Sequence, residues 1–288
     1  MPADADVMTA PPPRSPRSLR QEYDEFIEQR IDEYKDTLPR DDLLEIGNEA
    51  VAEIQKAPQF QLTEIVLTDQ VDAIIRRRLK LPSFRRWRER HLPLREAQRE
   101  AFHWGLAPGE PVTQLAERVA NGGPVLVVGA GDGAAALYLA ACGAQATVVD
   151  PDIAAVEGLE TRAAAEALGR RLECFVEPLS AWTPGREVHA CVIEPSALAD
   201  LSSAARVALI GRLQAATAPA GIHVVMPTSI ASSPRGGTTL SSDAFRTLYS
   251  EWIVPQRPSG AGRRAKNVGF LAIRPETRQS ETPLAVSN

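Results

Sequence analysis

Apolar side chains recur every three or four residues in the first third of the chain, a spacing that places them on one face of a helix. The pattern predicts two amphipathic helices within residues 19–57, separated at Pro39. A third helix is expected to begin at Thr63 or Thr68 and to end before Pro82. Phe84 starts a short fourth helix.

We expect the fourth helix to end before Pro93, because proline removes a hydrogen bond from a helix interior. The pattern therefore predicts a helical region over residues 19–105, followed by a second domain over residues 106–276. The segments 1–18 and 277–288 are rich in polar residues and proline, and we expect both to be disordered tails.

The spacing of the apolar residues changes after residue 124. Short runs rich in valine and isoleucine alternate with alanine- and leucine-rich segments of helical length, which is typical of a parallel sheet covered on both faces. The pattern predicts a doubly wound α/β domain with a mostly parallel sheet. The five expected strands are Val125–Val128, Ala146–Val149, Leu172–Val176, Val188–Ile193 and Ile222–Met226.

The charge, hydropathy and cysteine content of the chain narrow the classes of protein to which it can belong. The formal charge of −5 and the pI of about 5.6 give no global attraction to nucleic acid or anionic lipid. No apolar run reaches the roughly 18 residues that span a bilayer, and the start of the chain lacks the apolar middle of a signal peptide. We therefore expect a cytoplasmic protein without a membrane partner. Cys142, Cys174 and Cys191 are too widely spaced for a metal site, so we expect them in the core and expect no metal.

The helical region has an uneven charge distribution. Residues 76–99 hold ten arginines and lysines against two acids, whereas residues 21–56 hold twelve acids and four bases. The basic helices can pair with the acidic ones in a structural cap, or they can contact phosphates through the Arg76–Arg99 segment. We favour the cap, and a nucleic-acid partner stays open as the second interpretation.

The residues Pro124 to Asp150, PVLVVGAGDGAAALYLAACGAQATVVD, contain the main chemical signal. A strand that ends in Gly129-Ala130-Gly131-Asp132-Gly133 and runs into a helix places this turn at the carboxyl edge of the sheet, where ligands of such folds bind. Glycine permits the tight turn and the close approach of a ligand to the backbone. Asp150 ends the next strand, where a carboxylate can accept hydrogen bonds from ribose hydroxyls. If that is its only function, Asp150→Ala leaves the stability of the unliganded protein nearly intact.

VLVVGAGDG followed by TVVD resembles the glycine-rich motif and ribose-binding acid of class I S-adenosylmethionine-dependent methyltransferases. The resemblance covers residues 111–274 and includes a C-terminal segment, EWIVPQRPSGAGRRAKNVGFLAIRP, similar to the antiparallel hairpin that closes their Rossmann-like sheets. It implies a methyltransferase that binds S-adenosyl-L-methionine and acts on an unidentified acceptor, with a small molecule favoured over nucleic acid. The implied cofactor-binding residues are Gly129, Ala130, Gly131, Asp132, Gly133, Asp150, Pro151, Glu177, Pro178, Leu179 and Glu194.

The chain departs from the family pattern at three places. Val127 stands where the family usually has an acid, so an anchor near the amino-acid end of the cofactor is missing. Glu177-Pro178-Leu179 occupies the region where the family often has an aspartate facing the adenine. Glu194-Pro195-Ser196-Ala197 replaces the signature of enzymes that methylate amino groups on bases or glutamine, which disfavours that chemistry.

Three other functions stay open. GAGDG is similar to the turn of spermidine synthase-type aminopropyltransferases, which bind decarboxylated S-adenosylmethionine, but their N-terminal domain is β-stranded. Gly129, Gly131 and Ala134 also satisfy a nicotinamide or flavin pattern. A non-catalytic module that binds an adenosyl ligand is the third. For catalysis, His103 before the first strand is a candidate base because histidine titrates near neutral pH, and Glu194 is the other candidate.

Overall fold

The computed structural model describes residues 18–56, 63–120, 122–227, 242–255 and 269–276. Apart from Ser18, the two expected disordered tails lie outside the described residues. The chain divides into two compact units, residues 15–95 and residues 96–288 together with 1–14.

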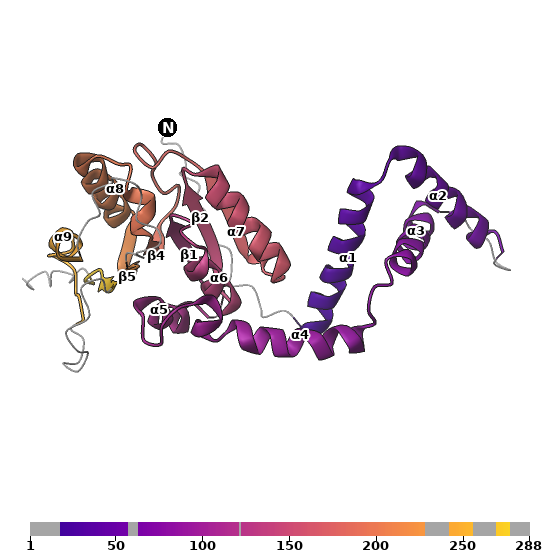
Figure 1. Ribbon diagram of the computed structural model, residues 1–288, viewed down its shortest axis with the longest axis horizontal. Helices are drawn as coiled ribbons and strands as arrows, with labels where there is room; N and C mark the ends of the chain where they lie inside the picture. The colour runs from indigo at the N-terminus through magenta and orange to yellow at the C-terminus, as the bar shows by residue number, and fades with distance from the viewer. Residues whose placement is uncertain (1–17, 57–62, 121, 228–241, 256–268, 277–288) are drawn as a thin grey trace, which may run out of the picture. The chain divides into compact units, whose positions relative to one another are not determined.

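The smaller unit is helical (Figure 1). Ser18 begins the first helix with a reciprocal capping box, and the Thr63 side chain accepts a hydrogen bond that caps the third. Isoleucines of three helices pack with Tyr23 and Trp87 in a core of their own. The helices are α1 (Leu19–Thr37), α2 (Arg40–Ile54), α3 (Glu64–Arg78) and α4 (Phe84–Gln98).

The fourth helix corrects an expectation. It continues through Pro93 to Gln98 instead of ending before the proline. Proline lacks only its own N–H, so a helix whose neighbouring turns are stabilised by packing can tolerate one. Trp87 and His91 provide such packing, since their rings stack with centroids 4.1 Å apart and Trp87 is buried.

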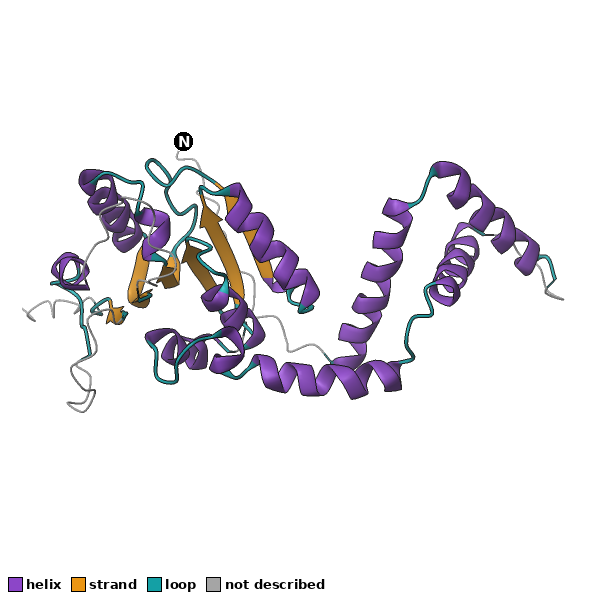
Figure 2. Cartoon of the chain, in the orientation of Figure 1, coloured by secondary structure: helices purple, strands orange, loops and turns teal. Residues whose placement is uncertain are grey.

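The larger unit is an α/β domain, as predicted. Figure 2 shows its strands as an inner layer with helices beside them. Its helices are η1 (Ala101–Trp104), α5 (Pro111–Val119), α6 (Ala134–Ala141), α7 (Ile153–Ala165), η2 (Gly169–Arg171), η3 (Pro195–Leu198), α8 (Ser203–Ala215) and α9 (Ser242–Leu248). Its strands are β1 (Pro124–Val128), β2 (Gln145–Asp150), β3 (Leu172–Val176), β4 (Val188–Ile193), β5 (Thr217–Val225) and β6 (Phe270–Ile273).

The six strands form one sheet in the order β3-β2-β1-β4-β5-β6. The pairs from β3 to β5 are parallel, and β6 is antiparallel to β5. Alternate strand residues face two separate apolar clusters: α5, α6 and α7 cover one face, and α8 and α9 pack on the other. The predicted doubly wound, mostly parallel sheet is therefore confirmed.

Two details differ from the expected strands. The fifth strand begins at Thr217 rather than Ile222, because residues 217–220 extend it across an irregularity in its register with β4. Ala220 in this stretch has a positive φ of 59°. In the C-terminal hairpin, β6 pairs with β5 as expected, while the first arm is reduced to a bridge between Ile253 and Ile273. The residues 256–268 between them lie outside the described part.

Candidate functional site

The glycine-rich turn lies where the sequence places it, directly after β1 and before α6. Gly129, Gly131 and Gly133 have φ values of +95°, +55° and +80°, a backbone conformation that favours glycine. Gly129 also approaches the segment that follows β4 so closely that an added Cβ would lie 2.6 Å from the Ala197 Cβ of η3. The three glycines are therefore required by the backbone even before any ligand is considered.

Asp150 stabilises this turn from the end of β2. Its side chain is only 4% exposed. Oδ2 accepts a hydrogen bond from the backbone N–H of Ala130 (2.7 Å), and Oδ1 accepts one from Asp152 (2.7 Å). The structure therefore changes the expectation that Asp150→Ala leaves the unliganded protein intact, because the substitution removes the acceptor of two backbone donors. A carboxylate has about four lone-pair positions, so Asp150 keeps capacity for further donors.

Glu194 follows β4 and covers the middle of the turn. A Cβ atom placed on Gly131 would lie 3.0 Å from Cδ of Glu194 and 3.2 Å from its Oε2. Burial raises the pKa of the Glu194 carboxyl to about 8, and the negative charges of Asp132, Glu110 and Asp150 contribute to the shift. Glu194 is therefore mostly neutral at pH 7.

Glu110, directly before α5, is a site residue that sequence reasoning missed. One carboxylate oxygen, Oε1, accepts a hydrogen bond from the backbone of Ala107 (2.9 Å). The other, Oε2, is buried and has no hydrogen-bond partner in the described part of the chain. An acid before a proline at a helix start resembles an ordinary capping residue in sequence, and only the fold places it near Glu194.

The remaining predicted cofactor residues have different environments. Asp132 is exposed and its Oδ1 accepts a hydrogen bond from the backbone of Ala134, the first residue of α6 (3.0 Å). Pro151, Glu177 and Pro178 are exposed after β2 and β3. Leu179 is 1% exposed and belongs to the apolar cluster under α8 and α9.

The structure does not bring His103 to the glycine turn. His103 Nε2 lies 3.8 Å from the Glu166 carboxylate, just beyond the last residue of α7. The glycine turn contacts α7 elsewhere, because a Cβ on Gly133 would lie 3.0 Å from Leu159 Cδ1 and Arg162 donates to the Asp132 carbonyl. No contact between His103 and the turn is found among the described residues, and its role as a base stays a prediction.

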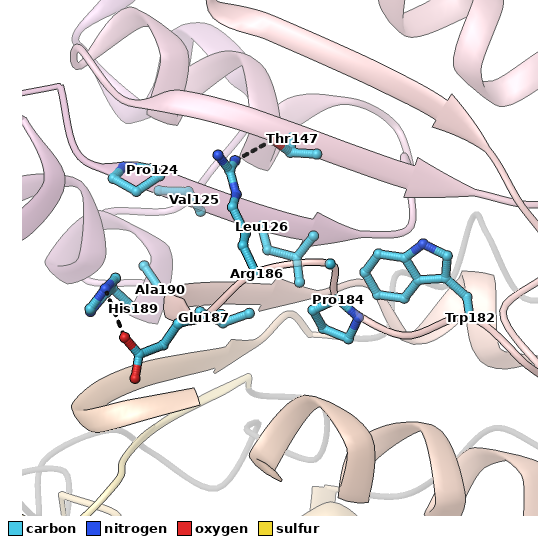
Figure 3. Close-up of a pocket in the computed structure, with 12 residues that line it drawn as sticks. Pro124, Val125, Leu126, Thr147, Trp182, Pro184, Arg186, Glu187, His189 and Ala190 are labelled. Carbon is cyan, nitrogen blue, oxygen red and sulfur yellow. Dashed lines mark hydrogen bonds and ion pairs between the residues drawn. The ribbon is translucent and has the colours of Figure 1, made fainter. Parts of the chain in front are cut away.

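A hollow separate from the turn lies on the face of β1 and β2 that α8 leaves open (Figure 3). The Arg186 side chain crosses it and donates to Thr147 Oγ1 (3.0 Å), with Trp182 and Pro184 at one end. It adjoins a second hollow that reaches Glu177. The connection between β3 and β4 contains no helix over residues 177–187, which leaves this face uncovered.

The chain is similar to solved methyltransferase structures. For the glycopeptide N-methyltransferase MtfA complexed with sinefungin, identity is 19% over 59% of this chain and 89% of that chain, with a TM-score of 0.43. For the N-methyltransferase NodS from Bradyrhizobium japonicum WM9, identity is 17% over 66% of this chain and 96% of that chain, with a TM-score of 0.44. For a SAM-dependent O-methyltransferase from Thermotoga maritima, identity is 12% over 58% of this chain and 66% of that chain, with a TM-score of 0.43.

No protein-family model and no curated protein matches the sequence. The solved structures that are similar to this chain include methyltransferases, at 12–19% identity for the three given above. At these TM-scores the likeness carries no argument about activity.

Proposed function

We propose that the larger unit binds S-adenosyl-L-methionine at the glycine-rich turn and transfers its methyl group to an acceptor. The observation that supports this most is the position of Asp150 beside the turn, with its carboxylate in contact with the Ala130 backbone. Three glycines with positive φ, at the carboxyl ends of parallel strands, make room for a ligand against the backbone. A small-molecule acceptor is favoured.

The residues of the turn fit an adenosyl cation. Gly131 and Asp132 would lie along the amino-acid end, Asp150 would accept from the ribose hydroxyls, and the exposed Glu177 and Pro178 would flank the adenine. In the described part of the chain, Glu110, Asp132 and Asp150 form no ion pair, so negative charge is available to a cationic ligand.

Little chemistry is required of the protein. S-adenosylmethionine supplies an activated methyl carbon, to which the acceptor's lone pair bonds while the carbon–sulfur bond breaks and its electron pair stays on sulfur. The chain aligns the reactants, and a proton leaves the acceptor. We retain Glu194 as the candidate that holds or moves this proton, because it is the titratable group against Gly131.

The aminopropyltransferase alternative has one specific observation in its favour. Four carboxylates surround the turn, and Arg162 at this turn donates to the Asp132 carbonyl rather than to a carboxylate. Decarboxylated S-adenosylmethionine has no carboxylate of its own to be repelled. The effect of the ligand's own carboxylate on binding therefore distinguishes methyl transfer from aminopropyl transfer.

Calorimetric titration with S-adenosylmethionine, its decarboxylated form, S-adenosylhomocysteine and NAD tests the proposal. We expect binding of S-adenosylmethionine and S-adenosylhomocysteine, and release of S-adenosylhomocysteine with a suitable acceptor. Preference for the decarboxylated compound would favour aminopropyl transfer, and preference for NAD would contradict both. Gly131→Val should abolish binding, since a β-branched residue is strained at a positive φ and meets Glu194. Gly158→Ala in the middle of α7, with open space around it, is the matched control.

A further inference from the structure

We propose that the outer edge of β3 binds an extended segment of another protein as an added strand, and that it selects a segment in which basic and apolar residues alternate. β3 is an end strand of the six-stranded sheet, and in the described part of the chain it pairs on one side only, with β2. This edge is separate from the glycine turn. Peptide binding there can be measured without an adenosyl ligand, so the proposal does not depend on the proposed function.

The first argument is the direction of the backbone groups of β3. The N–H of Glu177, just after the strand, donates to the Asp150 carbonyl of β2 (3.2 Å). Backbone groups of successive residues in a strand point to opposite sides, so the N–H and C=O groups of Cys174 and Val176 point away from β2. Among the described elements, no strand pairs with them. Two donors and two acceptors are thus in position to pair with another strand.

The second argument is that apolar side chains are exposed on both faces of this edge. Phe175 is 41% exposed and Val176 is 46% exposed, and no other large apolar side chain of the six described strands is exposed. The opposite edge of the sheet differs, because Phe270 of β6 is buried and Ile273 forms a bridge to Ile253. An edge strand with exposed apolar side chains is a ready template for strand addition.

The connection after β3 leaves room beside this edge, because it contains no helix. Glu173, Phe175 and Glu177 line the second hollow together with Trp182 and Arg186. These three residues of the β3 segment are two positions apart, so their side chains share one face at spacings of about 6.6 Å. A side chain on the same face of an added strand can therefore pack on Phe175 and enter the hollow.

The third argument is charge. Glu173 and Glu177 are exposed, and neither forms an ion pair with another described residue. The cation of the hollow, Arg186, donates to Thr147 on β2. Residues that lie opposite each other on paired strands stabilise the pair when their charges are opposite and destabilise it when their charges are alike. A segment with basic residues opposite the two glutamates and an apolar residue opposite Phe175 therefore fits this face.

A second copy of this chain fits the edge less well. An antiparallel pair of two β3 strands that uses the outward groups of both Cys174 and Val176 is centred on Phe175. Glu173 of each copy then lies opposite Glu177 of the other, and these like-charged pairs oppose the association. The charges favour a basic segment over a copy of this strand.

Fluorescence anisotropy tests the proposal with the full chain and a labelled probe peptide, Thr-Lys-Val-Leu-Val-Lys-Thr with blocked ends. In an extended strand, the two lysines and the leucine of this peptide share one face. The first control peptide has glutamate in place of both lysines, and the second is N-methylated at its central residues and so lacks main-chain donors. We expect saturable binding of the basic peptide and at least tenfold weaker binding of both controls.

Variants of the chain test the charge selection. Glu173→Lys should weaken binding of the basic peptide about fivefold or more and strengthen binding of the acidic one. Phe175→Thr, which keeps a strand-forming residue but removes the ring, should weaken binding several-fold. Glu117→Lys, at an exposed position of α5, is the matched control and should bind like the wild type. Circular dichroism verifies that each variant is folded.

Amide hydrogen exchange shows whether the peptide occupies the edge itself. Saturating peptide should slow exchange of the Cys174 and Val176 amides about tenfold or more, because their N–H groups become hydrogen-bonded. The Phe175 amide faces β2 already and should change by less than about twofold.

Three results would contradict the proposal. Equal affinity for the basic and acidic peptides would show that the glutamates do not select the segment. Binding without protection of the Cys174 and Val176 amides would mean that the peptide lies in the hollow and not on the edge. If the chain forms a dimer in which these two amides are protected, the occupant is a second copy. Each result leaves the proposed function unchanged, because the adenosyl-ligand titrations test that separately.

Discussion

The Asp150 carboxylate stabilises the glycine turn whether or not a ligand is bound, because both of its oxygens accept backbone hydrogen bonds. Asp150→Ala should lower the free energy of unfolding by about 2–4 kcal/mol, since two donors lose a charged acceptor. Asp150→Asn keeps one acceptor oxygen and should lose about half as much. Denaturant unfolding of the unliganded protein measures both.

The exposed Asp200 is the control for Asp150, and its replacement by alanine should change stability by less than about 0.5 kcal/mol. An Asp150→Ala protein as stable as the wild type would show that the turn does not depend on this carboxylate. Accepting hydrogen bonds from ribose hydroxyls would then be the only remaining role of Asp150.

Whereas Asp150 stabilises the folded protein, the Glu194 carboxyl lowers its stability at neutral pH. Its pKa is about 8 in the folded protein and near 4.5 when unfolded, so the unfolded chain loses its proton first as pH rises. Stability contributed by the neutral form is complete below pH 4.5 and falls as pH rises through 8. Glu194→Gln removes this loss, and should therefore raise the free energy of unfolding at pH 8 by up to about 4 kcal/mol.

Thermal unfolding at pH 5 and pH 8 checks this prediction. The gain from Glu194→Gln should be larger at pH 8, whereas Glu157→Gln should show no such difference. An equal effect at both pH values would mean that the carboxyl titrates normally. A residue that destabilises the free protein and stabilises a complex is typical of a binding site.

At the scale of elements, a buried histidine of β5, His223, connects that strand to Tyr249, the residue directly after α9. Thr217 Oγ1 donates to the Leu213 carbonyl (2.6 Å), so it accepts from Nε2 of His223 (2.7 Å), and Nδ1 accepts from the Tyr249 hydroxyl (2.8 Å). His223 is 0% exposed, and burial lowers its pKa to about 3. The neutral ring is thus the form that the network requires.

This network predicts acid sensitivity. The unfolded chain protonates His223 near pH 6.5, whereas the folded protein does so only near pH 3. Stability present above pH 6.5 should therefore fall by about 1.4 kcal/mol per pH unit below it. His223→Gln should flatten the slope of stability between pH 6.5 and 5, and the exposed His189→Gln should retain it; equal slopes in both variants would contradict the prediction.

The connection from β3 to β4 depends on one arginine of α8. Arg212 donates to the carbonyls of Trp182 (2.9 Å), Leu179 (3.1 Å) and Ser180 (2.9 Å). Since no helix lies in this connection, these hydrogen bonds hold the segment that follows the exposed Glu177 and Pro178.

Arg212→Ala should therefore destabilise the protein by about 2–4 kcal/mol and weaken adenosyl-ligand binding several-fold. Calorimetry and denaturant unfolding measure the two effects. Arg186→Ala, which loses an exposed hydrogen bond to Thr147, is the control and should change both by much less. Unchanged binding in Arg212→Ala would mean that this connection does not border the ligand.

At the scale of the whole molecule, the charge asymmetry is partly resolved by ion pairs inside the helical unit. Arg77 and Arg78 of α3 pair with Glu53 and Glu49 of α2, and Arg95 pairs with Glu22 of α1 (3.0 Å). These pairs support the interpretation of the basic segment as a structural cap. Arg86, Arg88 and Arg90 form no ion pair within the described residues.

We therefore expect the basic segment to contribute to stability and not to nucleic-acid binding. Arg95→Gln should destabilise the helical unit by about 1–2 kcal/mol, because its pair with Glu22 is partly buried, while Arg88→Gln should have little effect. Salt-sensitive micromolar binding to RNA or DNA, lost when Arg86 and Arg88 become glutamine, would contradict this.

None of the helices in the described part is both long and apolar enough to cross a bilayer.

The fold followed from local patterns. Helical and strand periods, Thr63 as a cap and the glycine turn after β1 are properties of adjacent residues, and the structure contains each of them. The end of α4 was predicted wrongly because packing around Trp87 and His91 overrides the local effect of Pro93.

The sequence alone determined the turn, its conformation and the acid at the end of β2, since the glycine spacing and the alternation of strand and helix are patterns of adjacent residues. Only the tertiary structure decided which charges meet there. Glu110 and Glu194 are 84 positions apart, and burial with two further acids, not any local pattern, makes Glu194 hold its proton. Likewise the sequence places His103 before β1, but only the tertiary structure places its ring 3.8 Å from the Glu166 carboxylate, because such contacts join residues far apart in the chain that no short motif records.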